Sequence, residues 1–143
     1  MSAIGEVSAR MRRVRRANTT GERLLQSALR KRGLKFSTHN KILDCRPDIV
    51  FREARVAVFL DGDFWHGRLL LERGSIALRR TFAPRIQEFW VSKIERNVCR
   101  DQRQVRRLRR HGWSVIRIWE HDLLVALDSY TVIIERRVRS RER

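Results

Sequence analysis

Acidic side chains and a histidine gather around FLDGDFWHG, residues 59–67, at the end of the hydrophobic run VAVFL. The alternation here predicts a hairpin, with one strand that starts after Asp48 and a partner that ends at Asp61. Acids are poor strand residues, so Asp48 is hard to explain by strand structure alone. Carboxylates at strand ends supply the oxygen ligands that Mg²⁺ prefers, and His66 is suited to proton transfer near neutral pH. Together they indicate metal-assisted phosphodiester cleavage.

Two further acids come from predicted helices. Glu22 lies in the first turn of a helix predicted over 19–33, where Thr19 and Glu22 also fit a capping box. Asp101 falls within the apolar stripe of a long helix predicted over 85–111, so we expect it to face the core. Each acid also has a structural explanation, since Glu22 can serve only the cap and Asp101 can pair with an arginine.

The loop residues have structural explanations of their own. Asp61 followed by Gly62 is a common turn pair, and His66 alone is more often structural or exposed. The aromatic rings of Phe64 and Trp65 can fold back onto the core. The residue types in this loop therefore favour a nuclease, but each of them is also compatible with a purely structural role.

The hairpin register follows from the turn. If Ala54 and Arg55 are the two turn residues, positions whose numbers add up to 109 face each other, and Asp48 lies opposite Asp61. A slip by one residue would move Asp61 to the other face of the sheet.

The remaining pattern predicts the elements that carry these residues. We expect a short strand in LKFSTH (34–39), a strand in WSVIRIW (113–119) and a last helix over 121–138, whereas 68–84 has no clear assignment. This order predicts an α/β fold with a mixed central β-sheet flanked by helices. The expected organisation is a basic arm at 1–17, one domain over 18–138 and a basic tail at 139–143.

The net charge of the chain indicates what kind of partner it binds. The 143 residues include 33 Lys and Arg against 16 Asp and Glu, which leaves a net charge of +17. Arginine forks match phosphate geometry, so nucleic acid is the expected polyanion, although a general arginine bias on a solvated surface is the alternative. Two cysteines are too few for a disulfide scaffold, and no apolar stretch is long enough for a membrane span. We therefore expect a cytoplasmic protein.

Four ordered blocks resemble the very short patch repair (Vsr) endonucleases, a family related to the PD-(D/E)XK or restriction-endonuclease-like fold. They are RMRRVRRANTTGE with Met11 eleven residues before Glu22, RPDIVF, VFLDGDFWHG, and EFWVSKIERNVCRDQRQVRRLRRHGWSVIRIWE with Asn97 and Asp101. The resemblance runs from about Met11 to about Asp122. It implies a Mg²⁺-dependent endonuclease, with one or two ions, that cuts duplex DNA 5′ to the mispaired T of a T:G mismatch.

The resemblance also implies roles. Asp48 and the backbone carbonyl of Leu60 would bind the metal, and His66 would transfer a proton or polarise the phosphate. Glu22 and Asp101 would position water, metal or histidine. The resemblance further implies that a wedge enters the DNA beside the mismatch, formed by Phe64, Trp65 and Met11. It also implies DNA contacts made by Arg10, Arg12, Arg13, Arg15, Arg16 and Asn97. By this resemblance we expect a nucleoid-associated monomer of bacterial or phage-like type that acts on double-stranded DNA. No membrane partner is expected, and the sequence does not identify repair proteins that would act with it.

Departures from the family keep other functions open. Positions where members hold a structural zinc carry Asp63, Arg68, Leu70 and His121, so we expect no structural zinc. Asp61 stands where the family often has histidine. The resulting site, with one histidine and an extra acid, is also similar to that of Vsr-like homing endonucleases. The alternatives are a sequence-specific homing or restriction-type endonuclease and, in another class, a non-catalytic DNA-binding module.

Overall fold

The structure is a computed structural model that describes residues 19–63 and 67–142. Within these residues the chain forms two compact units, each described by itself. The sheet unit comprises 19–61 and 104–142, and the helical unit is Gly62–Arg103. None of the described helices is long and apolar enough to cross a membrane.

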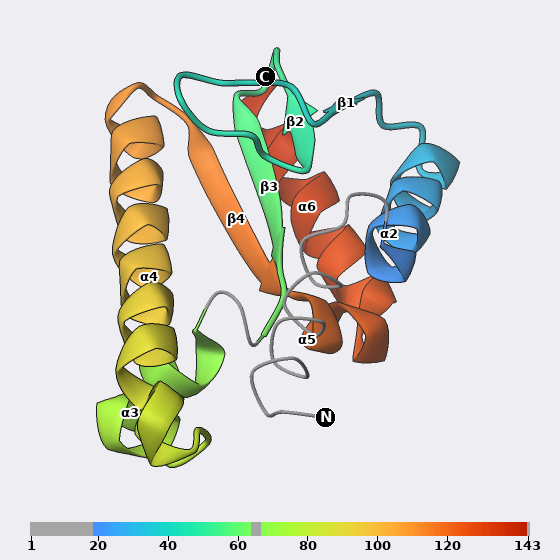
Figure 1. The fold of residues 1–143 in the computed structure, drawn as a ribbon. Coiled ribbons are helices and arrows are strands. Elements are labelled where there is room, and N and C mark those ends of the chain that lie inside the picture. Colours follow the sequence, from blue (N-terminus) through green and yellow to red (C-terminus); the bar gives the residue numbers. More distant parts are fainter. Residues whose placement is uncertain (1–18, 64–66, 143) are drawn as a thin grey trace. The chain divides into compact units, whose positions relative to one another are not determined.

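A four-stranded mixed sheet forms the centre of the sheet unit (Figure 1). The strands are β1 (Ser37–Thr38), β2 (Ile49–Phe51), β3 (Val56–Asp61) and β4 (Ser114–Trp119), in that spatial order. The β1–β2 and β2–β3 pairs are antiparallel, and β3 and β4 are parallel. The structure thus confirms the predicted α/β class with a mixed sheet flanked by helices, consistent with the restriction-endonuclease-like fold of Vsr enzymes.

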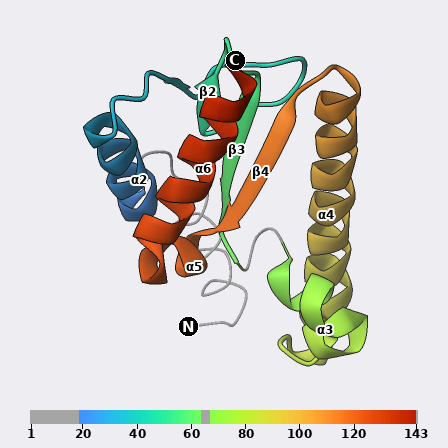
Figure 2. The same ribbon diagram turned by 180° about the vertical axis from the view of Figure 1, so that it is seen from behind.

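Alternation along the strands gives the sheet two apolar faces. Side chains such as Ile49 and Val58 pack beneath α2 (Thr20–Lys31), α5 (Glu120–Val125) and α6 (Leu127–Arg141), and Figure 2 shows α2 and α6 over this face. Val50, Ala57 and Phe59 point to the other face, where Leu108 near the end of α4 (Gln87–Arg110) packs on them. Burial on both faces holds the ends of β2 and β3 in place.

The predicted hairpin is present, but its register was wrong. Phe51 pairs with Val56, so four residues rather than two connect the strands, and paired positions add up to 107. Asp48 is therefore level with Phe59 and not with Asp61. Because the shift is two residues, Asp61 stays on the same side of the sheet as Asp48.

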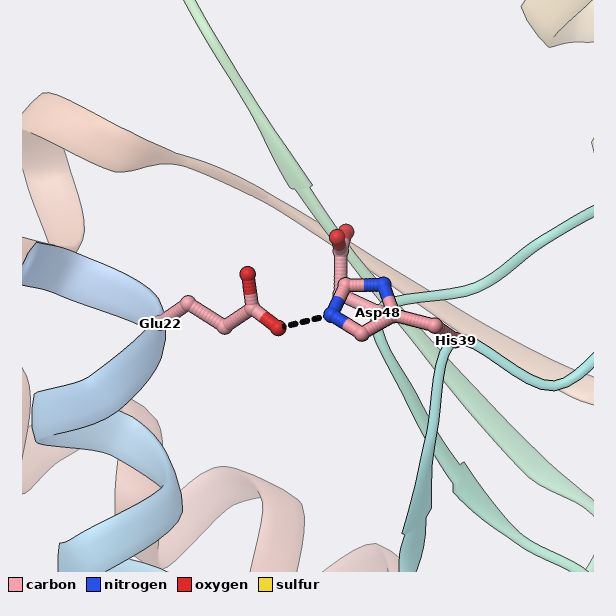
Figure 3. Close-up of side chains that lie close together, drawn as sticks. All are labelled: Glu22, His39 and Asp48. Carbon is pink, nitrogen blue, oxygen red and sulfur yellow. Dashed lines mark ion pairs between the residues drawn. The ribbon is translucent and has the colours of Figure 1, made fainter. Parts of the chain in front are cut away.

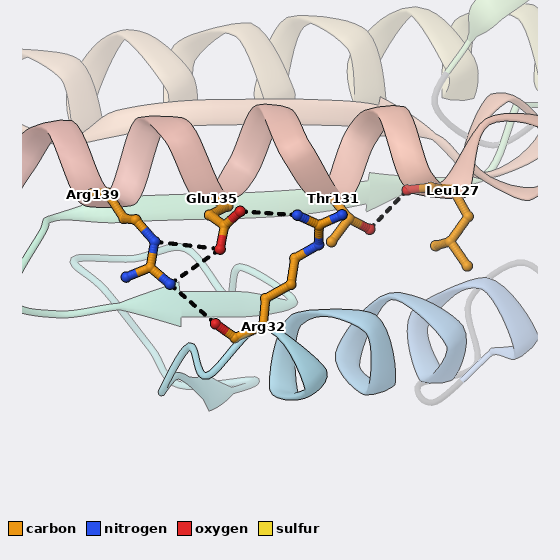
Figure 4. A network of polar contacts seen from close by, with 5 residues as sticks. All are labelled: Arg32, Leu127, Thr131, Glu135 and Arg139. Carbon is orange, nitrogen blue, oxygen red and sulfur yellow. Dashed lines mark hydrogen bonds and ion pairs between the residues drawn. The ribbon is translucent and has the colours of Figure 1, made fainter.

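The C-terminal region also differs from the prediction of a single helix. Ala126 has φ −132° and ψ 46°, which separates α5 from α6, and α6 continues to Arg141. The side chain of Arg139 donates to the carbonyl of Arg32 and, with the Arg32 side chain, pairs with Glu135 (Figure 4). Residues 139–141 of the segment expected as a basic tail therefore form the last turn of α6, which contacts Arg32 at the end of α2.

The helical unit accounts for the segment that the sequence left unassigned. It contains α3 (Arg68–Arg79), a short 3₁₀ helix η1 (Pro84–Ile86) and the first part of α4. These helices share a core of their own, formed by Leu78, Phe82, Ile86, Trp90, Val91, Ile94 and Val98. Apolar packing within this unit therefore holds 68–84.

Gly67 is expected to be a sensitive position in this core. It has φ +72°, and a Cβ there would lie 2.5 Å from Val98 Cγ2 and 3.0 Å from Ile94 Cγ2. We expect Gly67→Ala to destabilise the protein by about 2–3 kcal/mol through overpacking and left-handed strain, measured by urea unfolding. Gly33→Ala is the matched control, because Gly33 has a similar φ of +78° and open space where a Cβ would lie. Equal losses for the two variants would contradict the packing argument.

Candidate active site

Asp48 lies immediately before β2, and its side chain reaches the neighbouring strand. Its Oδ2 accepts a hydrogen bond from the amide of Leu60, at 2.7 Å. The Asp48 carboxylate therefore lies beside the backbone of Leu60. The role of the Leu60 carbonyl as a metal ligand stays a prediction.

Glu22 comes to the same place from the first turn of α2. Thr19 is the N-cap, and its side chain accepts from the Glu22 amide at 3.3 Å, so the predicted cap is confirmed. The Glu22 carboxylate has a further use, because its Oε1 accepts from Gln26 Nε2 at 3.1 Å and lies 2.5 Å from His39 Nε2. Figure 3 shows this carboxylate pointing toward the His39 ring. Capping alone therefore does not explain a buried acid at this position.

His39 is the site residue that sequence reasoning missed. It follows β1, and its amide donates to the carbonyl of Asp48 at 3.3 Å. The β1–β2 register pairs Thr38 with Ile49, so His39 is level with Asp48. The pairing of the short strand LKFSTH with RPDIVF would have revealed this neighbour, but the sequence did not specify that pairing.

Three potential metal ligands thus meet within the sheet unit. One ligand atom from each of Glu22, His39 and Asp48 lies within 4.8 Å of the others. Two carboxylates and an imidazole suit a divalent cation, and small side-chain shifts would bring them to one ion. The residues present therefore fit a divalent metal ion.

Electrostatics supports this fit. Burial is the main cause that raises the pKa of Asp48 to about 6, with the Glu22 and Asp61 charges adding to the rise. The Leu60 amide and His39 act in the opposite direction. A carboxylate that is costly to ionise in this place gains from a nearby cation.

Asp61 has a different environment from the three clustered residues. Arg117 donates to both of its carboxylate oxygens, at 2.7 and 2.6 Å, and the guanidinium lies over the Phe59 ring at 4.3 Å. Asp61 acts as a buried ion-pair partner in this arrangement, and its catalytic role stays a prediction.

Loss of this ion pair should cost stability. Arg117→Leu would leave the Asp61 carboxylate buried beside an apolar side chain. We expect a loss of about 3 kcal/mol in the free energy of unfolding, measured by urea denaturation at pH 7. Arg137→Leu is the control, because Arg137 makes an exposed contact with Ser114 and should change stability by less than about 1 kcal/mol. Similar effects of both variants would contradict a specific role for the Asp61 pair.

Comparison with known proteins decides the family. The family model described as DNA mismatch endonuclease Vsr matches residues 5–71. The DNA mismatch endonuclease Vsr of Escherichia coli K12 is 38% identical over 113 residues, which cover 79% of this chain and 68% of that protein. The type II nicking enzyme V.HpaIIP of Haemophilus parainfluenzae is 30% identical over 123 residues, covering 86% of this chain and 83% of that protein. In Neisseria meningitidis serogroup C, the type II nicking enzyme V.NmeDIP is 36% identical over 106 residues, covering 74% and 68%.

The chain belongs to the Vsr family. It is therefore an endonuclease that acts on DNA and nicks it, and the family places it among enzymes rather than non-catalytic DNA-binding modules. Nucleases of this kind generally use divalent metal ions, which agrees with the donor set of Glu22, His39 and Asp48.

Other predicted Vsr residues lie on α4 in the helical unit. Asn97 and Asp101 are both buried, which confirms the prediction that Asp101 lies on the inward-facing side of the helix. Asp101 also lies 3.3 Å from the Arg100 guanidinium, as the structural explanation anticipated. Their catalytic and DNA-binding roles remain predictions.

The positions expected to replace zinc ligands have partners of their own. Arg68 pairs with Asp63 at 2.9 Å and with Glu72 at 2.8 Å, and Leu70 packs against the helical core. The absence of structural zinc stays a prediction. The predicted loop and arm residues lie outside the described part of the chain; these are Phe64, Trp65, His66, Met11, Arg10, Arg12, Arg13, Arg15 and Arg16.

Proposed function

We propose that this Vsr-family endonuclease recognises a T:G mismatch in duplex DNA and, with Mg²⁺, cuts one strand 5′ to the mispaired T. The observation that carries the proposal is the meeting of Glu22, His39 and Asp48 in a chain of this family. The relatives support strand nicking and mismatch specificity through their descriptions as a DNA mismatch endonuclease and as nicking enzymes.

The sheet unit provides the metal-binding part of this function. Asp48 would hold Mg²⁺ with its carboxylate, with the Leu60 carbonyl as a second oxygen donor. Bound there, the ion would polarise the scissile phosphate and acidify a bound water. Glu22 would add negative charge and orient the ligands around the ion.

Proton transfer and DNA recognition would come from the other predicted residues. His66 would move a proton at the scissile phosphate, and Asp101 would orient the groups around it. Phe64 and Trp65 would wedge beside the mismatch, which costs less where a base pair is already disturbed. The arginines at 10–16 would contact the DNA backbone.

The direct test is a nicking assay on two end-labelled duplexes that differ only in one T:G pair. The flanking sequence is varied, and the cut is mapped at single-nucleotide resolution with Mg²⁺ or with EDTA. We expect one Mg²⁺-dependent cut 5′ to the T and none in the paired duplex. Cleavage of the paired duplex at a fixed sequence would contradict mismatch repair and establish a homing or restriction-type endonuclease.

The wedge makes a separate prediction. Trp65→Ala should reduce discrimination between the T:G and paired duplexes by about 1–3 kcal/mol, because one base stack has this value. Competition binding of the two duplexes measures the effect without cleavage. Unchanged discrimination in a folded variant would show that this ring does not stack on DNA.

A further inference from the structure

The candidate metal site contains one nitrogen donor among oxygen donors. His39 Nε2 lies 2.5 Å from Glu22 Oε1, but the contact lacks the geometry of a hydrogen bond. Within the described residues, this buried nitrogen has no hydrogen-bond partner. A buried imidazole nitrogen without such a partner, beside two carboxylates, is in a suitable position for a metal ion.

We propose that His39 Nε2 is a direct ligand of the divalent cation, together with Glu22 and Asp48, and that the site consequently binds Mn²⁺ more tightly than Mg²⁺. The proposal rests on the proposed function only in requiring a divalent cation at Asp48. It adds a ligand and a metal preference that the all-oxygen site would not have.

The geometry is compatible with one shared ion. Ligands about 2.1 Å from an octahedral ion are about 3.0 Å apart when adjacent and about 4.2 Å apart when opposite. The three donor atoms lie within 4.8 Å of one another, so modest side-chain shifts bring them to one centre. The Glu22–His39 contact would open by about 0.5 Å, which a terminal side-chain rotation supplies.

The backbone fixes His39 in this position. Its amide donates to the Asp48 carbonyl, so the two ligands are tied together across adjacent strands. Glu22 is held separately by the N-cap of α2 and by Gln26. Two carboxylates also balance the charge of a divalent ion while the imidazole stays neutral. The ligand set is therefore pre-positioned by three different segments of the chain.

The donor type determines the expected metal preference. Mg²⁺ favours oxygen ligands and retains its water, whereas first-row transition ions accept imidazole nitrogen more readily. If His39 only oriented Glu22, the ion would have oxygen ligands alone and this preference would not depend on position 39.

Pulsed electron paramagnetic resonance of the full-length protein with Mn²⁺ alone tests direct ligation. We expect nitrogen modulation from one imidazole in the wild type, retained in His66→Gln and in His111→Gln but absent in His39→Gln. Incorporation of ¹⁵N-histidine into the wild type should change the modulation frequency, which tests imidazole ligation even if His39→Gln fails to fold. No nitrogen coupling in the wild type, or loss in His66→Gln instead, would overturn the proposal.

Metal binding gives an independent readout. Calorimetric titration with MnCl₂ or MgCl₂ should show that His39→Gln weakens Mn²⁺ binding by at least about 10-fold and Mg²⁺ binding by less. Equal loss for both ions would overturn the metal preference. Nicking of the T:G duplex is recorded on the same samples, so a failed mismatch assay with intact nitrogen ligation would reject the substrate and leave the ligand assignment standing.

Discussion

Asp48→Asn is expected to slow nicking of a T:G duplex by about 10³-fold or more. Asparagine keeps the size of the side chain and an oxygen that can accept from the Leu60 amide. It removes the negative charge that would hold the cation, and metal catalysis supplies several kcal/mol of transition-state stabilisation. Single-turnover nicking with Mg²⁺ measures the loss, and DNA binding in EDTA should be unchanged or tighter because one negative charge near phosphate is removed.

The same variant should be more stable than the wild type at neutral pH. Burial raises the pKa of Asp48 to about 6 in the folded protein, whereas an unfolded aspartate has a pKa of about 3.9. The folded state therefore binds the proton more tightly, so this stabilisation is present below about pH 4 and is lost as the pH rises through about 6. Asp48→Asn avoids that loss, and we expect a gain of about 2–3 kcal/mol at pH 8 in EDTA and little gain near pH 4.

Two results would contradict this account of Asp48. The first is nicking by Asp48→Asn at a rate within 10-fold of the wild type, because the charge would then be dispensable. The second is a stability difference that does not depend on pH, because the carboxylate would then not be costly to ionise. Asp44→Asn is the control for charge removal, since Asp44 pairs with Arg107 on the surface of the same unit.

His66→Ala is expected to slow nicking by about 10²–10⁴-fold, the usual contribution of a general acid or base. Metal binding should survive, because the three clustered residues Glu22, His39 and Asp48 do not include His66. The measurement is the single-turnover rate at saturating Mg²⁺ across pH 5.5–8.5. A histidine that carries the proton contributes one limb of the pH–rate profile, and the variant should lose that limb.

His111→Ala is the matched control, because His111 is exposed just beyond α4 and its ring Nδ1 lies 2.9 Å from the carbonyl oxygen of Arg107. Its rate and pH profile should equal those of the wild type. An unchanged rate in His66→Ala would remove this histidine from the mechanism.

The positions of site residues could be predicted from the sequence where a strand end or the hydrophobic periodicity of a helix determines them. Asp48 had to precede β2 because the apolar run begins directly after it, and Asp101 had to face inward because it completes the α4 stripe. The register failed by two residues because a four-residue connection, with Arg55 at φ +55°, replaces the expected two-residue turn. Turn length depends on local backbone geometry that residue types in REAR did not specify.

Long-range pairing explains what the sequence did not show. His39 becomes a site residue only because β1 pairs with β2, and a two-residue strand leaves too little alternation to fix a partner. Residues 68–84 were unassigned because α3 contains Gly74 at φ +87°, which interrupts helical periodicity. The break at Ala126 carries no proline or glycine, so it was read as a continuous helix.

The central claim is that the cation of this endonuclease binds among Glu22, His39 and Asp48. Anomalous diffraction from a crystal of the protein soaked in MnCl₂ tests it most directly. The account predicts one strong peak within about 2.3 Å of an oxygen of Asp48 and within ligand distance of Glu22 and His39. A peak bound only by other carboxylates, or none beside Asp48 at saturating Mn²⁺, would contradict it.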